Sequence, residues 1–214
     1  MRTSSGSQAA LDGSGVGCTA LELPPLRVRV GVGLIVFVLA LILRALFIAE
    51  MAGSPLFAGP EVEPDAAYYD KAAREIAAGQ LVGSEPFYMA PLYPYTLGMV
   101  YAVTSEPRDG EAGRFAARWV QAVAGATCAV LVASIAWCLG GWLAGLIAGL
   151  VAAGYGFLVF SDALLMATTV ILLVHLAALR AFLGAWRRPD SPWRWLLAGG
   201  LTGLSILAHG TRSE

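Results

Sequence analysis

The apolar segment at residues 28–49 does most to constrain the fold of this chain, because it contains only two charged residues, Arg29 and Arg44. A helix of about 20 mostly apolar residues crosses the hydrocarbon core of a bilayer. The whole sequence is 57% hydrophobic and 14% charged, which is too apolar for a soluble core with a polar surface. We therefore expect an all-α, polytopic transmembrane helical bundle.

Further apolar segments are long enough, or nearly so, to cross a bilayer: residues 115–138, 142–160, 163–183 and 195–209. The first two are separated by a tight turn at "LGG", residues 139–141. A shorter apolar segment, residues 92–103, contains Pro94 and Gly98 and is marginal in length. Whether it crosses the membrane decides the topology.

Arginines mark two regions as cytoplasmic under the positive-inside rule: Arg2, Arg27 and Arg29 before the first span, and Arg187, Arg188 and Arg194 between the last two. Both regions lie on one side only if the segment at 92–103 does not cross. We therefore predict five spans in the cell inner membrane, with a cytoplasmic N-terminus. Residues 50–114 then form an external loop with interfacial helices at 65–78 and 92–103.

The amino-terminal segment and the cysteines provide no candidate catalytic or metal-binding residues. Residues 1–27 are rich in Gly and Ser without an apolar run, which predicts a disordered cytoplasmic tail ahead of a membrane domain at 28–214. Cys18, Cys128 and Cys138 lack metal-ligand spacing. No basic stripe is present, so we expect the bilayer as a partner and no nucleic acid.

The stretch "EPDAAYYDKAAREIAAG", residues 63–79, predicts an amphipathic helix that starts at Pro64 and Asp65 and stops at Gly79. Helical spacing gives it an apolar face of Tyr69, Ala72, Ala73 and Ile76. Asp70, Lys71, Arg74 and Glu75 are predicted on the opposite face, with i,i+4 pairs. Asp65 itself has two interpretations: a helix cap, or a carboxylate used in chemistry.

Asp162, in "FSDALL", also has two interpretations. With Ser161 it can cap the start of the next helix. An acid at a bilayer boundary also suggests a charged partner or a water-filled cavity. The predicted topology places Asp162 on the same face as Asp65, and one of two converging carboxylates can act as base on an acceptor hydroxyl or amine. Arg44 is either an interfacial anchor or a cation for a departing phosphate.

The aromatic stretch "FYMAPLYPYTLGMVYA", residues 87–102, suits a slot for a lipid tail or a sugar, or an interfacial anchor. His175, in the middle of a span, is expected to be neutral, hydrogen-bonded to a neighbouring helix and without a functional role.

Taken in order, "LRALFI", "PDAAYYDKAAREIAAG", "FYMAPLYPYTLGMVYA", "FSDALL" and "GLTGLSILAHGTR" resemble the amino-terminal part of the GT-C glycosyltransferases. The resemblance is nearest to the protein O-mannosyltransferase and lipid A aminoarabinose-transferase branch, glycosyltransferase family 39-like. It implies transfer of a sugar from a polyprenyl-phosphate carrier to a lipid, glycan or protein acceptor at the external membrane face.

The resemblance also implies roles for particular residues. Asp65 matches the catalytic acid of the first external loop, and Asp162 matches the second external aspartate. Candidate substrate-binding residues are Arg44, Tyr68, Tyr69, Tyr93 and Arg212. No cofactor or metal site is expected, with a weak divalent site at Glu61, Glu63 and Asp65 as the open alternative.

Some positions depart from the family pattern. Ala66 stands where many relatives carry a second acid, and Met89 and Ala90 stand where many carry a basic residue. Relatives have more spans, so we expect an amino-terminal portion that is inactive alone. The alternatives are a small multi-pass transporter, a non-catalytic membrane subunit, or a scaffold in which Asp65 and Asp162 only cap helices.

Overall fold

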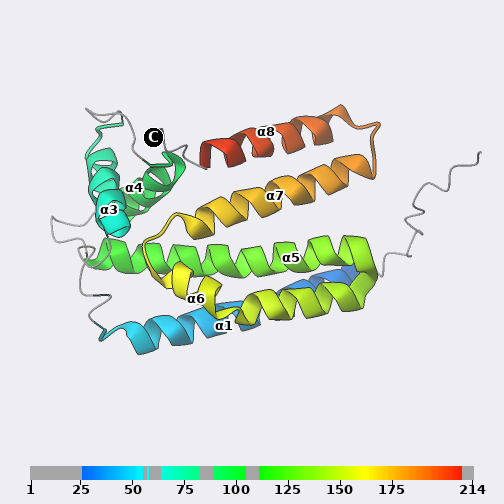
Figure 1. Ribbon diagram of the computed structural model, residues 1–214, viewed down its shortest axis with the longest axis horizontal. Helices are drawn as coiled ribbons and strands as arrows, with labels where there is room; N and C mark the ends of the chain where they lie inside the picture. The colour runs from blue at the N-terminus through cyan, green and yellow to red at the C-terminus, as the bar shows by residue number, and fades with distance from the viewer. Residues whose placement is uncertain (1–25, 55–56, 58–63, 82–88, 105–110, 209–214) are drawn as a thin grey trace, which may run out of the picture.

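The computed structural model describes residues 26–54, 57, 64–81, 89–104 and 111–208, and within these ranges every regular element is a helix (Figure 1). The helices are α1 (Leu26–Met51), α3 (Pro64–Ala77), α4 (Leu92–Thr104), α5 (Glu111–Gly154), α6 (Gly156–Ala163), α7 (Thr168–Trp186) and α8 (Pro192–Ala208). The all-α prediction is confirmed for this part of the chain.

Helix α5 is a hairpin of two arms that reverses direction at Gly141 (Figure 1). Gly141 has φ 83° and ψ −175°, a backbone conformation that glycine adopts without steric cost. The arms pack closely, since a Cβ built on Gly145 would lie 2.8 Å from the Ala133 carbonyl oxygen. The reversal falls within the "LGG" stretch at which the sequence predicts a turn.

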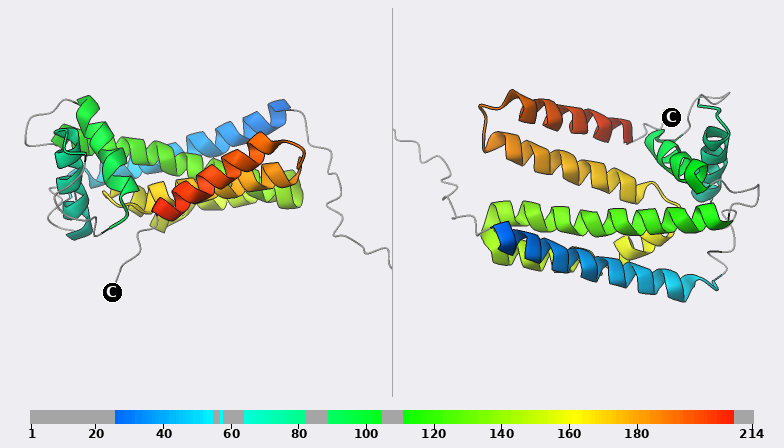
Figure 2. Two further views of the ribbon diagram at one scale, coloured as in Figure 1. Left: turned by 90° about the horizontal axis from the view of Figure 1, so that it is seen from above. Right: turned by 180° about the vertical axis from the view of Figure 1, so that it is seen from behind.

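The long axis of the bundle is followed by α1, both arms of α5, α7 and α8, whereas α3 and α4 lie together at one end (Figures 1 and 2). This α3–α4 end also contains the end of α1, the start of α5 and the α6–α7 turn. The other, arginine-rich end contains Arg27 and Arg29 of α1 and the α7–α8 loop with Arg187 and Arg188. Asp65 and Asp162 therefore lie toward the same end.

Among the described residues, three helices, α1, α5 and α7, are long and apolar enough to cross a membrane. Their outer surfaces carry large exposed hydrophobic side chains such as Leu34, Leu46 and Val151. Inside the bundle, α1 and α5 meet through small buried residues, among them Ala40, Ala126 and Ala153. Small residues at helix contacts let backbones approach closely, as in membrane helix bundles.

Two helix boundaries differ from the prediction. Tyr155 is extended, at φ −71° and ψ 104°, and separates α5 from α6. Residues 164–167 form a turn between α6 and α7. Asp162 therefore lies in the last turn of α6, and its interpretation as the cap of a following helix is wrong. The two helices predicted at 65–78 and 92–103 are present within one residue of those bounds, as α3 and α4.

The end of α3 follows the sequence signal. Gly79 has a φ of 92° and donates its backbone N–H to the Ile76 carbonyl at 2.9 Å, while the Gln80 N–H reaches the Glu75 carbonyl at 3.0 Å. A left-handed glycine after the last turn is a common way to satisfy the final carbonyls of a helix. The predicted stop at Gly79 is confirmed.

Candidate functional site

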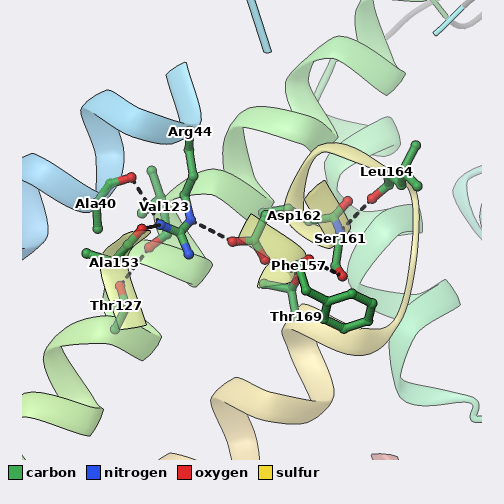
Figure 3. Close-up of polar contacts among 11 residues, drawn as sticks. Ala40, Arg44, Val123, Thr127, Ala153, Phe157, Ser161, Asp162, Leu164 and Thr169 are labelled. Carbon is green, nitrogen blue, oxygen red and sulfur yellow. Dashed lines mark hydrogen bonds and ion pairs between the residues drawn. The ribbon is translucent and has the colours of Figure 1, made fainter. Parts of the chain in front are cut away.

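An ion pair between Arg44 of α1 and Asp162 of α6 lies inside the bundle (Figure 3). The Arg44 Nε is 2.5 Å from the Asp162 Oδ2, and the two side chains are only 1% and 4% exposed. Arg44 also donates from Nη1 to the carbonyl oxygens of Ala40 at 3.1 Å and Ala153 at 3.4 Å. Arg44 therefore points inward and does not extend toward the membrane surface as an interfacial anchor.

The second Asp162 oxygen is also engaged, because the Thr169 hydroxyl of α7 donates to Oδ1 at 2.5 Å (Figure 3). Space for the pair comes from Gly125 on the first arm of α5. A Cβ built on Gly125 would lie 1.9 Å from Asp162 Oδ2 and 2.7 Å from Arg44 Nε. Both carboxylate oxygens are thus occupied, and this arrangement favours a positioning role for Asp162.

Gln121 connects the same region to α4. Its amide nitrogen donates to the carbonyl oxygens of Leu164 at 3.0 Å and Met166 at 3.1 Å, both in the α6–α7 turn. Its amide oxygen accepts from the Tyr93 hydroxyl at 3.1 Å. Gln121 is buried, so its three polar contacts fix the α6–α7 turn against α4 and α5.

The aromatic residues predicted to bind substrate form a packed cluster between α3 and α4. Tyr69 and Tyr93 are buried and meet edge to face with ring centroids 4.8 Å apart. Tyr68 is half-buried and meets Tyr69 edge to face at 5.6 Å. Leu165 and Ala167 belong to the same hydrophobic cluster. Tyr69 and Tyr93 thus belong to the buried part of the cluster, and Tyr68 packs against it as the most accessible of the three residues.

Asp70 lies on the packed face of α3, and its predicted place on the polar face is wrong. It is 5% exposed, accepts from Arg74 Nε at 2.8 Å and accepts from the Tyr101 hydroxyl of α4 at 2.6 Å. Burial and the hydrogen bond to Asp70 raise the pKa of Tyr101 far above its usual range. The predicted Asp70–Arg74 pair within α3 is confirmed, and the hydrogen bond from Tyr101 to Asp70 fastens α3 to α4.

Asp65 lies in the first turn of α3, where a carboxylate interacts favourably with the helix dipole. Its side chain is half-buried. Burial raises the pKa of Tyr69 to about 12, and the nearby Asp65 carboxylate adds to that shift. Asp65 therefore sits beside the aromatic cluster with part of its surface open.

A cavity of about 730 Å³ opens at the same end of the bundle, between the end of α1 and the start of α5. Its wall is formed by Ile48, Ala52, Gly53, Ser54, Phe57, Glu111, Ala112, Arg114, Phe115 and Arg118. Arg114 and Arg118 are each 8% exposed. The Arg118 guanidinium lies 4.1 Å from the Phe57 ring centroid, and its Nε has no hydrogen-bond partner among the described residues.

Such a cavity is suited to an anion. Two arginines one helical turn apart present guanidinium groups that match phosphate oxygens. A buried donor without a partner is costly, and a bound phosphate oxygen would satisfy it. The sequence alone indicates Arg44 and Arg212 as the candidates for phosphate binding. Arg44 is committed to Asp162, and Arg212 lies outside the described residues, as do Glu61 and Glu63.

Some functional candidates were missed from sequence. The i,i+4 spacing of Arg114 and Arg118, on an otherwise apolar segment, was a usable signal that both face one side of a helix. Gln121 carried a weaker signal, as an amide within the same apolar segment. Gly125 carried none, because glycine is common in membrane helices.

No family model, no curated protein and no solved structure matches this chain.

Proposed function

We propose that this chain is the membrane-embedded, amino-terminal part of a glycosyltransferase that takes its sugar from a polyprenyl-phosphate carrier. The observation that carries the proposal is the cavity lined by the buried Arg114 and Arg118, at the same end of the bundle as Asp65. The resemblance of the "PDAAYYDKAAREIAAG" and "PLYPY" motifs to the GT-C enzymes supports the same function.

In the proposed mechanism, Arg114 and Arg118 bind the carrier phosphate. The apolar wall of the cavity, which includes Ile48 and Phe115, borders the first isoprene units of the lipid. As the bond between the sugar C1 and the phosphate oxygen breaks, negative charge grows on the departing polyprenyl phosphate. The two guanidinium groups stabilise that charge where it develops.

Asp65 is the proposed general base. The acceptor oxygen or nitrogen attacks the sugar C1, and its proton passes to the Asp65 carboxylate. Phosphate is already a good leaving group, so a separate general acid is not required. Asp162 is given a positioning role: with Arg44, Thr169 and Gln121 it holds the α6–α7 turn, whose Leu165 belongs to the same cluster as Ala66, the residue after Asp65.

The location of the buried charges favours an enzyme over a transporter. Arg44, Arg114, Arg118 and Asp162 are buried toward the α3–α4 end. A transporter is expected to hold ionisable groups along a path through the middle of the membrane.

We further propose five crossings in the cell inner membrane, with the arginine-rich end cytoplasmic and the α3–α4 end external. The crossings are α1, the first arm of α5, the second arm with α6, α7 and α8. This arrangement leaves α3 and α4 at the external surface. It agrees with the parity of the predicted spans.

Cysteine labelling tests the topology. In a chain without its native cysteines, a membrane-impermeant maleimide should label the Gln80→Cys variant in intact cells. It should label the Asp190→Cys variant only after permeabilisation. Both positions are exposed and lie at opposite ends of the bundle. Labelling of both from the same side would contradict the five-span arrangement.

The Asp65→Asn change tests the chemistry. In native membranes that hold the full-length transferase to which this chain is proposed to belong, we expect consumption of a labelled polyprenyl-phosphate sugar to fall on the order of a hundredfold or more, because the base is lost. The matched control is Glu75→Gln, an acid on the same helix outside the proposed site, which should keep the wild-type rate. Wild-type consumption by the Asp65→Asn variant, at equal protein level, would return Asp65 to a structural role.

A further inference from the structure

A second hollow lies at the opposite, arginine-rich end of the bundle, between the start of α1 and the end of the first arm of α5. Its volume is about 450 Å³. It is lined by Leu26, Arg29, Val30, Gly33, Leu34, Phe37, Val130, Ala133, Ser134, Trp137 and Cys138. We refer to it as the α1–α5 groove, and nothing in the proposed transfer reaction uses it.

The groove is apolar along its length and basic at one place. Among the described residues that line it, Arg29 is the one charged residue, and its side chain is half-buried. The same described lining contains no Asp or Glu. Close by, Arg187 donates from Nη2 to the backbone carbonyl of Cys138, which brings a second guanidinium to this end of the groove.

We propose that the α1–α5 groove binds an anionic phospholipid of the surrounding bilayer. One acyl chain lies along Val30, Leu34 and Phe37, and the phosphate meets Arg29. A mostly apolar hollow of a few hundred Å³ with a few polar groups, here Arg29 and Ser134, is typical of a site for a small amphiphilic ligand. Basic pockets between membrane helices on the cytoplasmic side are suited to anionic headgroups. A polyprenyl carrier is not the occupant we expect, because its proposed phosphate site is at the other end.

The test measures lipid retention. The purified full chain is placed in nanodiscs made from equal parts phosphatidylglycerol and phosphatidylcholine. It is then released from the nanodiscs, and the lipids that remain bound to it are counted by native mass spectrometry. The wild-type chain should retain phosphatidylglycerol in preference to phosphatidylcholine. The Arg29→Gln variant should lose about fivefold in phosphatidylglycerol retention, with little change for phosphatidylcholine.

A variant that fills the groove tests the proposal independently of Arg29. A Cβ at Gly33 would lie 3.7 Å from Val130 Cγ1, an ordinary contact, so the side chain of Gly33→Leu extends into the groove without a backbone clash. This variant should lose retention of both lipids. The matched controls are Gly31→Leu, whose Cβ would meet nothing within 4 Å, and Arg27→Gln at an exposed position outside the lining.

Both controls should keep most of the wild-type phosphatidylglycerol retention, and thermal unfolding verifies that all four variants are folded. Equal retention of the two lipids by the wild-type chain would overturn the proposal. An Arg27→Gln loss as large as that of Arg29→Gln, or unchanged retention in Gly33→Leu, would overturn it as well.

Discussion

Replacement of Asp162 by asparagine is expected to destabilise the chain by about 3–5 kcal/mol, because Arg44 is left as a buried charge without its counter-ion. The aspartate and asparagine side chains are nearly isosteric, so the loss of stability comes from the removed charge and not from a change in side-chain volume. Arg44 and Asp162 are 2.5 Å apart and almost fully buried, which excludes solvent as a substitute partner. The measurement is the free energy of unfolding in mixed micelles, with exposed Asp190→Asn as the matched control.

The double variant with Arg44→Met and Asp162→Leu shows how much of that loss comes from leaving Arg44 without its counter-ion. Removal of both charges leaves no uncompensated ion, so the double variant should be markedly more stable than Asp162→Asn. A double-mutant cycle gives the coupling energy between the two residues. An Asp162→Asn chain that unfolds like the wild-type chain would show that the ion pair contributes nothing, contrary to our interpretation.

The second large effect is expected at Gly125. Its Cβ would lie 1.9 Å from Asp162 Oδ2, so Gly125→Ala must displace the ion pair. Overpacking alone costs about 1–3 kcal/mol, and the weakened pair adds to that cost. We expect a loss of unfolding free energy close to that of Asp162→Asn.

Two controls make the Gly125 prediction specific. In the Asp162→Ala background the nearest atoms are gone, so Gly125→Ala should cost less than in the wild-type chain. Gly200→Ala, on α8, introduces a Cβ with nothing within 4 Å and should be neutral or stabilising by about 0.5–1 kcal/mol. Equal effects at Gly125 and Gly200 would contradict the predicted clash.

Local patterns were sufficient for much of the fold. The length of the apolar segments predicted α1, α5 and α7, and glycines with positive φ lie at the predicted stop, Gly79, and within the predicted turn, Gly141. These features depend on neighbouring residues alone. The break at Tyr155 is not predicted, because the apolar pattern continues across it. Asp162 is assigned to the wrong helix because the turn lies at residues 164–167 and not at Ser161 and Asp162.

The site was less predictable, because its contacts join distant segments. Arg44 and Asp162 are 118 positions apart, and no local pattern indicates that one is the partner of the other. Asp70 is predicted on the polar face of its helix. It is instead buried against α4, where the Tyr101 hydroxyl donates a hydrogen bond to it. Sequence alone gives Arg114 and Arg118 no role, because Arg114 ends the predicted external loop at 50–114 and Arg118 lies in the segment at 115–138, predicted only as a membrane span.

Carrier-phosphate binding tests the central claim most directly. Affinities of the nanodisc-embedded chain for a short-chain polyprenyl phosphate and for the matching polyprenol are compared. The phosphate should bind more tightly than the alcohol, and Arg118→Gln should weaken its binding on the order of tenfold, because a charged hydrogen bond is lost. Arg180→Gln, outside the cavity lining, and Asp65→Asn should leave binding unchanged. Equal binding of phosphate and alcohol, or unaltered binding by Arg118→Gln, would contradict our account of the cavity.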